Sequence, residues 1–305
     1  MKLLKESLDG MSPFTHDRML AYLDDLQVRH PSLEIGTLGE SVMGRSIPLI
    51  TLGKGEKSVL YVGTHSGTDW ICTVLLLRYL EEFLSYHEKN GQAFRYSIPY
   101  LFSARTVYIV PMLNPDGVEY VCRGVPQDHV LYERVSHMND ESEDFSEWRG
   151  NARGVELDRN YSFGFAAYKQ LEGHMGILGG GKSGFSGEMP ESEPETAALC
   201  NFLRCRSDIR ALLSLHLSGE KILYTAGNKT VPRSSAISNA LSRLTGYATC
   251  CYDGWESMGG LGAWCIDELD LPAFSIGCGK PCEKTDGFRL YTVLREALFT
   301  MPTMI

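Results

Sequence analysis

The sequence has no Cys-x-x-Cys pair, no apolar run long enough to cross a bilayer and no excess of basic residues. Its nine cysteines form no tight framework, and the adjacent Cys250 and Cys251 have a spacing that rarely closes a disulfide, which favours buried free thiols. Residues 1–11 contain two lysines but lack the apolar segment of a signal peptide. These absences predict a cytoplasmic protein without a membrane-spanning helix.

The charge balance excludes further classes of partner. The chain has 29 lysines and arginines against 38 aspartates and glutamates, a formal net charge of -9. A protein with this charge is not attracted to phosphate backbones or to anionic lipid, so neither nucleic acid nor a membrane surface is an expected partner. The 43% of hydrophobic residues is typical of a globular protein with a sizeable core.

Hydrophobic periodicity predicts helices and strands that alternate along the chain. We expect helices at residues 15–30, 71–87, 194–206, 234–244 and 289–298, and strands at residues 33–35, 47–52, 58–62, 106–112, 211–216 and 273–276. Residues 114–187 are rich in Gly, Ser, Asp and Glu, so we expect mostly loop there, and substrate contacts within it. No repeat or linker divides residues 1–305. The pattern predicts a single α/β domain with a mostly parallel or mixed twisted sheet and helices on both faces.

Six short motifs follow one another along the chain. They are Gly44-Arg45, VGTHSGTDW at residues 62–70, NPDG at residues 114–117, GVELDRNY at residues 154–161, SEPET at residues 192–196, and Leu215-His216. In this order and spacing they resemble the zinc metallocarboxypeptidases of the carboxypeptidase A type, and within that family the bacterial branch of γ-D-glutamyl-diamino acid peptidases, which cut murein peptides. The resemblance runs from about residue 14 to the C-terminus. It implies a carboxypeptidase-like fold, a peptide or murein-peptide ligand and a zinc ion.

The resemblance also implies where zinc ligands belong. The family binds zinc through a His and a Glu three residues later, followed by a Trp, and through a second His at a strand end. Aligned on Trp70, these positions are Ser66, Asp69 and His216. A serine hydroxyl is a poor zinc ligand, and Asp69 places its carboxylate about 1.5 Å closer to the backbone than Glu would. We therefore expect weak zinc binding or none.

One neighbouring histidine offers an alternative ligand. His65 precedes Ser66 and would enter the ligand set if the alignment shifted by one residue. In an extended segment, adjacent side chains point to opposite faces, so we expect His65 to lie on the side of the strand end away from the metal position.

The family's general base is a Glu on a late strand, and the matching position in this chain is Gly277. Glycine cannot accept a proton from water, and the loss of a positioned base costs about 10²–10⁴ in rate. Asp267 and Glu268 lie nearby in sequence, but they read as the solvated end of a helix.

Positions that contact substrate in the family are partly retained. Arg149 stands at the place of the arginine that stabilises the oxyanion, and Arg159 at that of the arginine that grips a terminal carboxylate. Asp158 replaces the Asn that assists it, and we expect Asp158 to repel a carboxylate or to form an ion pair with Arg159. Trp255 stands where the family has a tyrosine on a mobile loop before a Gly-Gly pair. Instead of contacting substrate, both arginines could have a structural role as ion-pair partners of local acids. Trp255 could likewise have a structural role, packing over its own loop.

Two functions follow from these replacements. The first is a catalytically disabled member of the family, whose cleft binds peptides or murein fragments. The second is an active zinc peptidase with a ligand set rebuilt around His65, Asp69 and His216. Simultaneous changes at two ligand positions, at the base and at the carboxylate-binding Asn favour the first.

Overall fold

The computed structural model describes residues 2–8, 12–251, 254–279 and 286–305. Its main sheet has eight strands within this part of the chain, in the order β1-β2-β6-β3-β7-β10-β8-β9. The middle strands β6, β3, β7 and β10 are parallel, whereas β1, β2 and β8 each pair antiparallel with a neighbour, so the sheet is mixed. The strands are β1 (Glu34–Glu40), β2 (Ser46–Gly53), β3 (Lys57–Gly63), β6 (Arg105–Val110), β7 (Ile209–His216), β8 (Gly219–Leu223), β9 (Ala248–Cys250) and β10 (Ala273–Gly279), with β4 (Gln92–Ala93) and β5 (Tyr96–Ser97) in a separate small hairpin.

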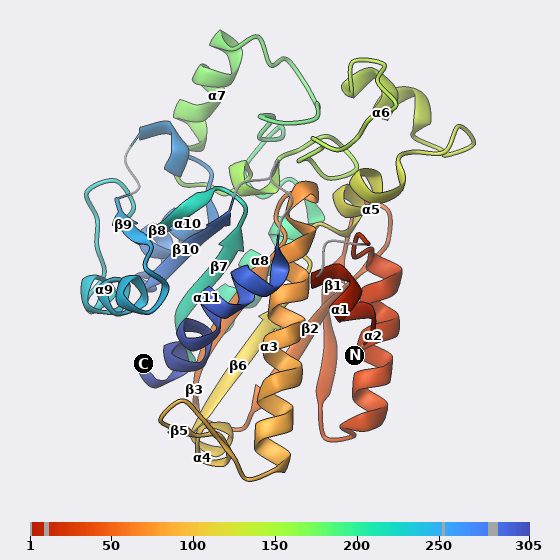
Figure 1. The fold of residues 1–305 in the computed structure, drawn as a ribbon. Coiled ribbons are helices and arrows are strands. Elements are labelled where there is room, and N and C mark those ends of the chain that lie inside the picture. The colour runs from red at the N-terminus through yellow and green to blue at the C-terminus, as the bar shows by residue number, and fades with distance from the viewer. Residues whose placement is uncertain (1, 9–11, 252–253, 280–285) are drawn as a thin grey trace.

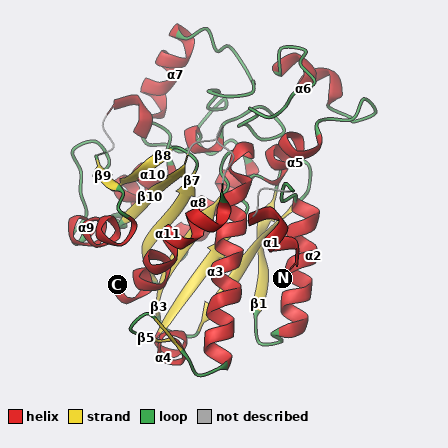
Figure 2. Cartoon of the chain, viewed as in Figure 1, coloured by secondary structure: helices red, strands yellow, loops and turns green. Residues whose placement is uncertain are grey.

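Helices cover the sheet on both sides (Figures 1 and 2). The α-helices are α1 (Lys2–Leu8), α2 (His16–Arg29), α3 (Trp70–Glu88), α4 (Ile98–Ala104), α5 (Pro115–Arg123), α6 (Tyr132–Met138), α7 (Phe165–His174), α8 (Pro194–Arg204), α9 (Ser234–Thr245), α10 (Leu261–Leu269) and α11 (Gly287–Thr300). In Figure 1, α3 and α11 lie in front of the sheet, and α6 and α7 lie above its upper end.

The alternation of side chains in the central strands explains these layers. Val59 and Tyr61 of β3 pack in one apolar cluster with residues of α1, α2, α3, α9 and α11, whereas Leu60 and Val62 pack in a second cluster with α8 and α10. Each fully buried side chain of this size contributes about 1.5–3 kcal/mol. The two clusters hold a single α/β domain together, as the sequence predicted.

Each helix and strand predicted from periodicity is present within two residues or so of its expected start. The prediction of mostly loop for residues 114–187 is confirmed, although α5, α6 and α7 lie there as well. The start of α5 has a recognisable signal: the Asn114 side chain accepts a hydrogen bond from the Gly117 amide at 2.9 Å, and Pro115 follows at the first helical position. Among the described residues, no helix is both long and apolar enough to cross a bilayer.

Candidate functional site

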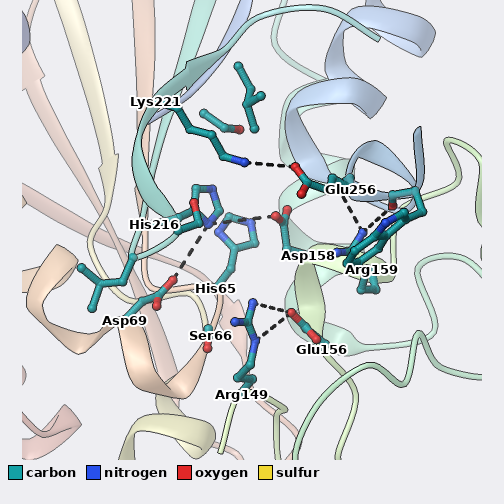
Figure 3. A pocket seen from close by; sticks show the side chains of 15 residues that line it. His65, Ser66, Asp69, Arg149, Glu156, Asp158, Arg159, His216, Lys221 and Glu256 are labelled. Carbon is teal, nitrogen blue, oxygen red and sulfur yellow. Dashed lines mark hydrogen bonds and ion pairs between the residues drawn. The ribbon is translucent and has the colours of Figure 1, made fainter. Parts of the chain in front are cut away.

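A pocket of about 260 Å³ opens at the carboxyl ends of β3 and β7, and Figure 3 shows its side chains. Open α/β sheets bind ligands at this edge. Eight of the residues that line the pocket were named in the sequence analysis: His65, Ser66, Asp69, Arg149, Asp158, Arg159, His216 and Trp255. The other lining residues are Glu156, Leu217, Ser218, Lys221, Leu223, Glu256 and Ser275. Segments far apart in the sequence therefore meet at one place, as the order of motifs predicted.

The loop after β3 sets the direction of the first side chains. Thr64 adopts φ 57°, a left-handed conformation that breaks the alternation of the strand. His65 consequently faces the pocket, with its ring centroid 5.2 Å from that of His216, and the expectation that it would point away was wrong. The Asn114 carboxamide holds this loop by donating to the carbonyl oxygens of His65 and Gly150 at 3.0 and 3.1 Å.

His65 is buried against Tyr161. Its ring is 1% exposed, and Nε2 hydrogen-bonds with the Tyr161 hydroxyl at 3.1 Å. Burial lowers the pKa of His65 to about 3, an effect that the nearby Asp158 carboxylate opposes. Its Nδ1 has no hydrogen-bond partner.

His216 stands at the centre of the pocket floor. Nε2 hydrogen-bonds with Ser214 Oγ at 2.9 Å, and Ser214 Oγ with Ser275 Oγ at 2.9 Å. On the other side of the ring, Nδ1 lies 4.0 Å from Asp69 Oδ2 and 4.0 Å from Asp158 Oδ2. Asp69 and His216 thus share one face of the sheet edge, and the Ser214–Ser275 chain that fixes the ring had no signal in the sequence.

The two carboxylates beside His216 differ in environment. Burial raises the pKa of Asp69, although His216 and Arg149 act against it. Burial also acts to raise the pKa of Asp158, but His216, His65, the Leu261 amide and Arg159 together outweigh it and the pKa is lowered. Asp158 Oδ1 accepts a hydrogen bond from the Leu261 amide at 3.0 Å. Asp158 is therefore the more readily ionised of the pair.

Arg149 pairs with Glu156, one of the local acids expected from the sequence. Its Nη2 and Nε donate to Glu156 Oε1 at 2.6 and 3.0 Å, and the Gly184 amide donates to the other carboxylate oxygen at 2.8 Å. Burial acts to raise the pKa of Glu156, but the Arg149 guanidinium outweighs it, so the pKa is lowered.

Arg149→Met is expected to lower the free energy of unfolding by about 2 kcal/mol near neutral pH, because Glu156 loses its partner while the 40% exposure of Arg149 moderates the loss. A lowered carboxyl pKa contributes stability above the unfolded value, and this stability is lost as the pH falls through the folded value. The difference between the two proteins should therefore shrink on acidification, measured by urea denaturation at several pH values. Arg289→Met, at a largely exposed pair with Glu220, is the control and should change stability little. A loss independent of pH would contradict this account.

Arg159 does not pair with Asp158, contrary to one expectation from the sequence. Its Nη1 donates to the backbone carbonyls of Trp255, Glu256 and Met258 at 2.9, 3.1 and 3.1 Å. Its guanidinium also stacks between the Tyr168 and Trp255 rings, at 4.9 and 5.1 Å from their centroids. The guanidinium is thus engaged by the η3 turn (Gly254–Ser257) and the residues beside it.

The mouth of the pocket contains a pair that sequence reasoning missed. Lys221 of β8 forms an ion pair with Glu256 at 3.0 Å (Figure 3), and Trp255, which also lines the pocket, is 51% exposed. Neither residue belongs to a motif, so only the fold brings them together. By contrast, Glu268 of α10 bonds with Arg204 and Trp264 and does not line the pocket, as expected for a structural acid.

The sequence profile of the zinc carboxypeptidases matches residues 19–260. The chain belongs to the zinc carboxypeptidase family. Gamma-D-glutamyl-L-diamino acid endopeptidase 1 of Lysinibacillus sphaericus is 28% identical over 291 residues, which cover 95% of this chain and 72% of that protein. The protein YqgT of Bacillus subtilis is 26% identical over 253 residues, which cover 82% of this chain and 66% of YqgT.

Solved structures show the same zinc carboxypeptidase fold. The structure of thrombin activatable fibrinolysis inhibitor superposes with a TM-score of 0.70 at 18% identity, covering 99% of this chain and 79% of that one. Murein-tripeptide amidase MpaA from Escherichia coli O157 superposes with a TM-score of 0.53 at 20% identity, covering 87% and 92%. These likenesses establish the fold of the domain.

The donor atoms in this chain do not fit the zinc site of the family. Ser66 Oγ, at the first histidine position, hydrogen-bonds with Thr68 Oγ1 at 2.8 Å. The 4.0 Å between His216 Nδ1 and Asp69 Oδ2 exceeds the roughly 3.4 Å that separates two tetrahedral ligands of one zinc ion. Across the described part of the chain, no three His, Cys, Asp or Glu side chains form a metal-binding group.

Gly277, expected from the sequence to match the family's general base, faces closely packed backbone. Gly277 of β10 pairs with His216 on one side and Lys221 on the other. A Cβ at Gly277 would lie 2.2 Å from the Gly219 carbonyl oxygen and 3.0 Å from Ser218 Oγ. Gly277 does not have a positive φ, so the obstacle is this close approach of the β7–β8 turn. The strand therefore has no room for a glutamate where the family places one. Tyr252, which could have replaced the family's tyrosine, lies outside the described residues.

Proposed function

We propose that the pocket binds peptides or murein-type fragments without hydrolysing them. The observation that carries this proposal is the contact at Gly277, because the Gly219 carbonyl occupies the space of the family's general base. Water in the pocket would lack that proton acceptor, which alone removes about 10²–10⁴ in rate. Ser66 at a ligand position adds to the loss, since its hydroxyl neither carries charge nor offers an imidazole nitrogen.

Binding is supported by what remains of the cleft. The pocket still lies at the sheet edge, and Trp255 offers an exposed aromatic face at its mouth. We propose that Asp158, Arg149 and Trp255 contact the ligand, and that Arg159 contributes by fixing the rim around Trp255. The similarity to an endopeptidase whose name specifies γ-D-glutamyl-L-diamino acids supports a γ-D-glutamyl peptide as the first ligand to test.

The test uses γ-D-glutamyl-L-lysine, a dipeptide with a diamino acid. Calorimetric titration should detect binding, and chromatography with mass detection should find no cleavage, with zinc added or with chelator. Saturable binding of the dipeptide without cleavage supports the proposal. Zinc-dependent cleavage of the dipeptide would overturn it, as would the absence of binding.

The second candidate is an active zinc peptidase that uses His65, Asp69 and His216. One observation favours it: Nδ1 of His65 has no hydrogen-bond partner, and the His65 and His216 rings lie side by side. This candidate predicts stoichiometric zinc in the purified protein, which metal analysis measures directly. It still lacks a base at Gly277.

A further inference from the structure

The positive side chains of the pocket are already engaged by protein groups. Arg149 is paired with Glu156, and Lys221 is paired with Glu256. Arg159 donates to three backbone carbonyls. Arg159, at the position of the arginine that grips a carboxylate in the family, is thus already hydrogen-bonded to backbone groups of the protein itself. A ligand carboxylate would have to break existing hydrogen bonds to be received here.

The negative side chains on the floor are not balanced in this way. Asp69 and Asp158 form no ion pair with a lysine or arginine in the described part of the chain, and each lies 4.0 Å from His216 Nδ1. Asp158 replaces a neutral Asn of the family, so the floor has gained an acid at the same time as the site has lost a fit to zinc. Figure 3 shows the two carboxylates on either side of His216.

A second and independent observation indicates a missing donor. His65 lines the pocket and is only 1% exposed, and its Nδ1 has no hydrogen-bond partner in the described part of the chain. A buried polar atom without a partner is unfavourable, because it has lost its hydrogen bonds to water. His216 Nε2 can donate to Ser214 Oγ, which leaves its Nδ1 as an acceptor facing two carboxylates. When His65 Nε2 donates to the Tyr161 hydroxyl, its Nδ1 is an acceptor as well, and the two ring nitrogens then converge with the two carboxylates on one region as acceptors.

The spacing of these atoms can be compared with the geometry around an ammonium and around a zinc ion. An ammonium nitrogen with hydrogen bonds of about 2.8 Å places two of its tetrahedral acceptors about 4.6 Å apart. Two ligands of one zinc ion lie only about 3.4 Å apart. The separation of 4.0 Å from His216 Nδ1 to each carboxylate lies midway between these two values, so small movements would suit an ammonium, and zinc is disfavoured by the Ser66 hydroxyl at a ligand position rather than by this distance.

We propose that the pocket floor binds a primary ammonium group of the ligand, held between Asp69 and Asp158 with His216 and His65 as further acceptors. The inference rests on the proposed peptide-binding function and specifies which charged group of the ligand enters the pocket. An ammonium is a compact charge with three donors, which suits acceptors on several sides. The pocket floor would then bind a positively charged group of the ligand, whereas the family's arginine binds a negatively charged carboxylate.

The experiment compares three forms of γ-D-glutamyl-L-lysine: unmodified, acetylated on both amino groups, and amidated on both carboxyl groups. Acetylation should weaken binding by roughly 10-fold or more, because a buried charged hydrogen bond is lost. Amidation should change affinity by less than about threefold, since no free arginine awaits the carboxylates. The same order should hold in chelator.

Asp158→Asn tests the site itself, because its carboxamide oxygen still accepts the Leu261 amide while the charge is removed. This variant should bind the acetylated and unmodified dipeptides within about threefold of each other. Asp69→Asn is a second variant with the same expectation. The matched control is Asp270→Asn, an exposed residue at φ 48°, where asparagine is well tolerated, and it should keep the preference of the wild type. Circular dichroism confirms that each variant is folded.

The outcomes separate the inference from the proposed function. If amidation weakens binding more than acetylation, or if the preference requires added zinc, the ammonium site is wrong while peptide binding stands. If the preference persists in both Asp158→Asn and Asp69→Asn, the assignment of these carboxylates is wrong. If none of the three forms binds, the proposed function fails and the inference with it.

Discussion

Gly277→Ala is expected to destabilise the protein by about 3 kcal/mol or more, and Gly277→Glu is expected to prevent folding. A Cβ at this position would lie 2.2 Å from the Gly219 carbonyl oxygen, a backbone atom that cannot rotate away, so β8 would have to separate from β10. Overpacking in a well-packed core typically costs about 1–3 kcal/mol, and a backbone clash belongs at or beyond the upper end. Urea denaturation of Gly277→Ala and soluble expression of Gly277→Glu provide the measurements.

Gly173→Ala is the matched control for this prediction. Gly173 lies in α7, and a Cβ there would have no neighbour within 4 Å. Replacement by alanine should stabilise the helix by about 0.5–1 kcal/mol. If Gly277→Ala instead unfolds at the same urea concentration as the wild type, the β7–β8 turn yields easily, and replacing the family's base becomes a feasible route to activity.

Ser66→His combined with Asp69→Glu is expected to tighten zinc binding by on the order of 10²-fold or more. Structural zinc sites bind with about 10–16 kcal/mol shared among four ligands, so one well-placed imidazole adds about 3 kcal/mol. Calorimetric titration with a competing chelator measures both proteins. The single substitutions serve as controls, and Ser66→His should account for most of the gain. Equal zinc affinity in the wild type and the double variant would show that the wild-type donors already form a site.

The fold was largely predictable because its signals are local. Hydrophobic periodicity marked α2, and short apolar runs marked the buried strands β3, β6 and β7. Asp69 and His216 were expected together because parallel strands end at the same edge of a sheet. The short strand β8 and the edge strand β9 carry too few residues for a periodic signal, and they were missed.

The finer geometry of the site depended on chain paths that periodicity does not reveal. His65 was assigned to the wrong side because the alternation rule assumes an extended backbone, and the left-handed Thr64 breaks it. The obstacle at Gly277 arises from the turn between β7 and β8. The partners of Arg159 are backbone carbonyl groups, which every residue has, so the sequence gives no signal for them. Glu156 as the partner of Arg149 was accessible, since an acid seven residues away was among the candidates.

The three carbonyls held by one nitrogen of Arg159 also affect how quickly a ligand is received. Ordering a backbone residue costs about 1–2 kcal/mol of conformational entropy, and Arg159 fixes Trp255, Glu256 and Met258 when the domain folds. The residues around Trp255 at the mouth of the pocket are therefore already ordered before a ligand arrives, so binding does not require a loop to close first. Differences in affinity among related peptides should then appear mainly in their dissociation rates.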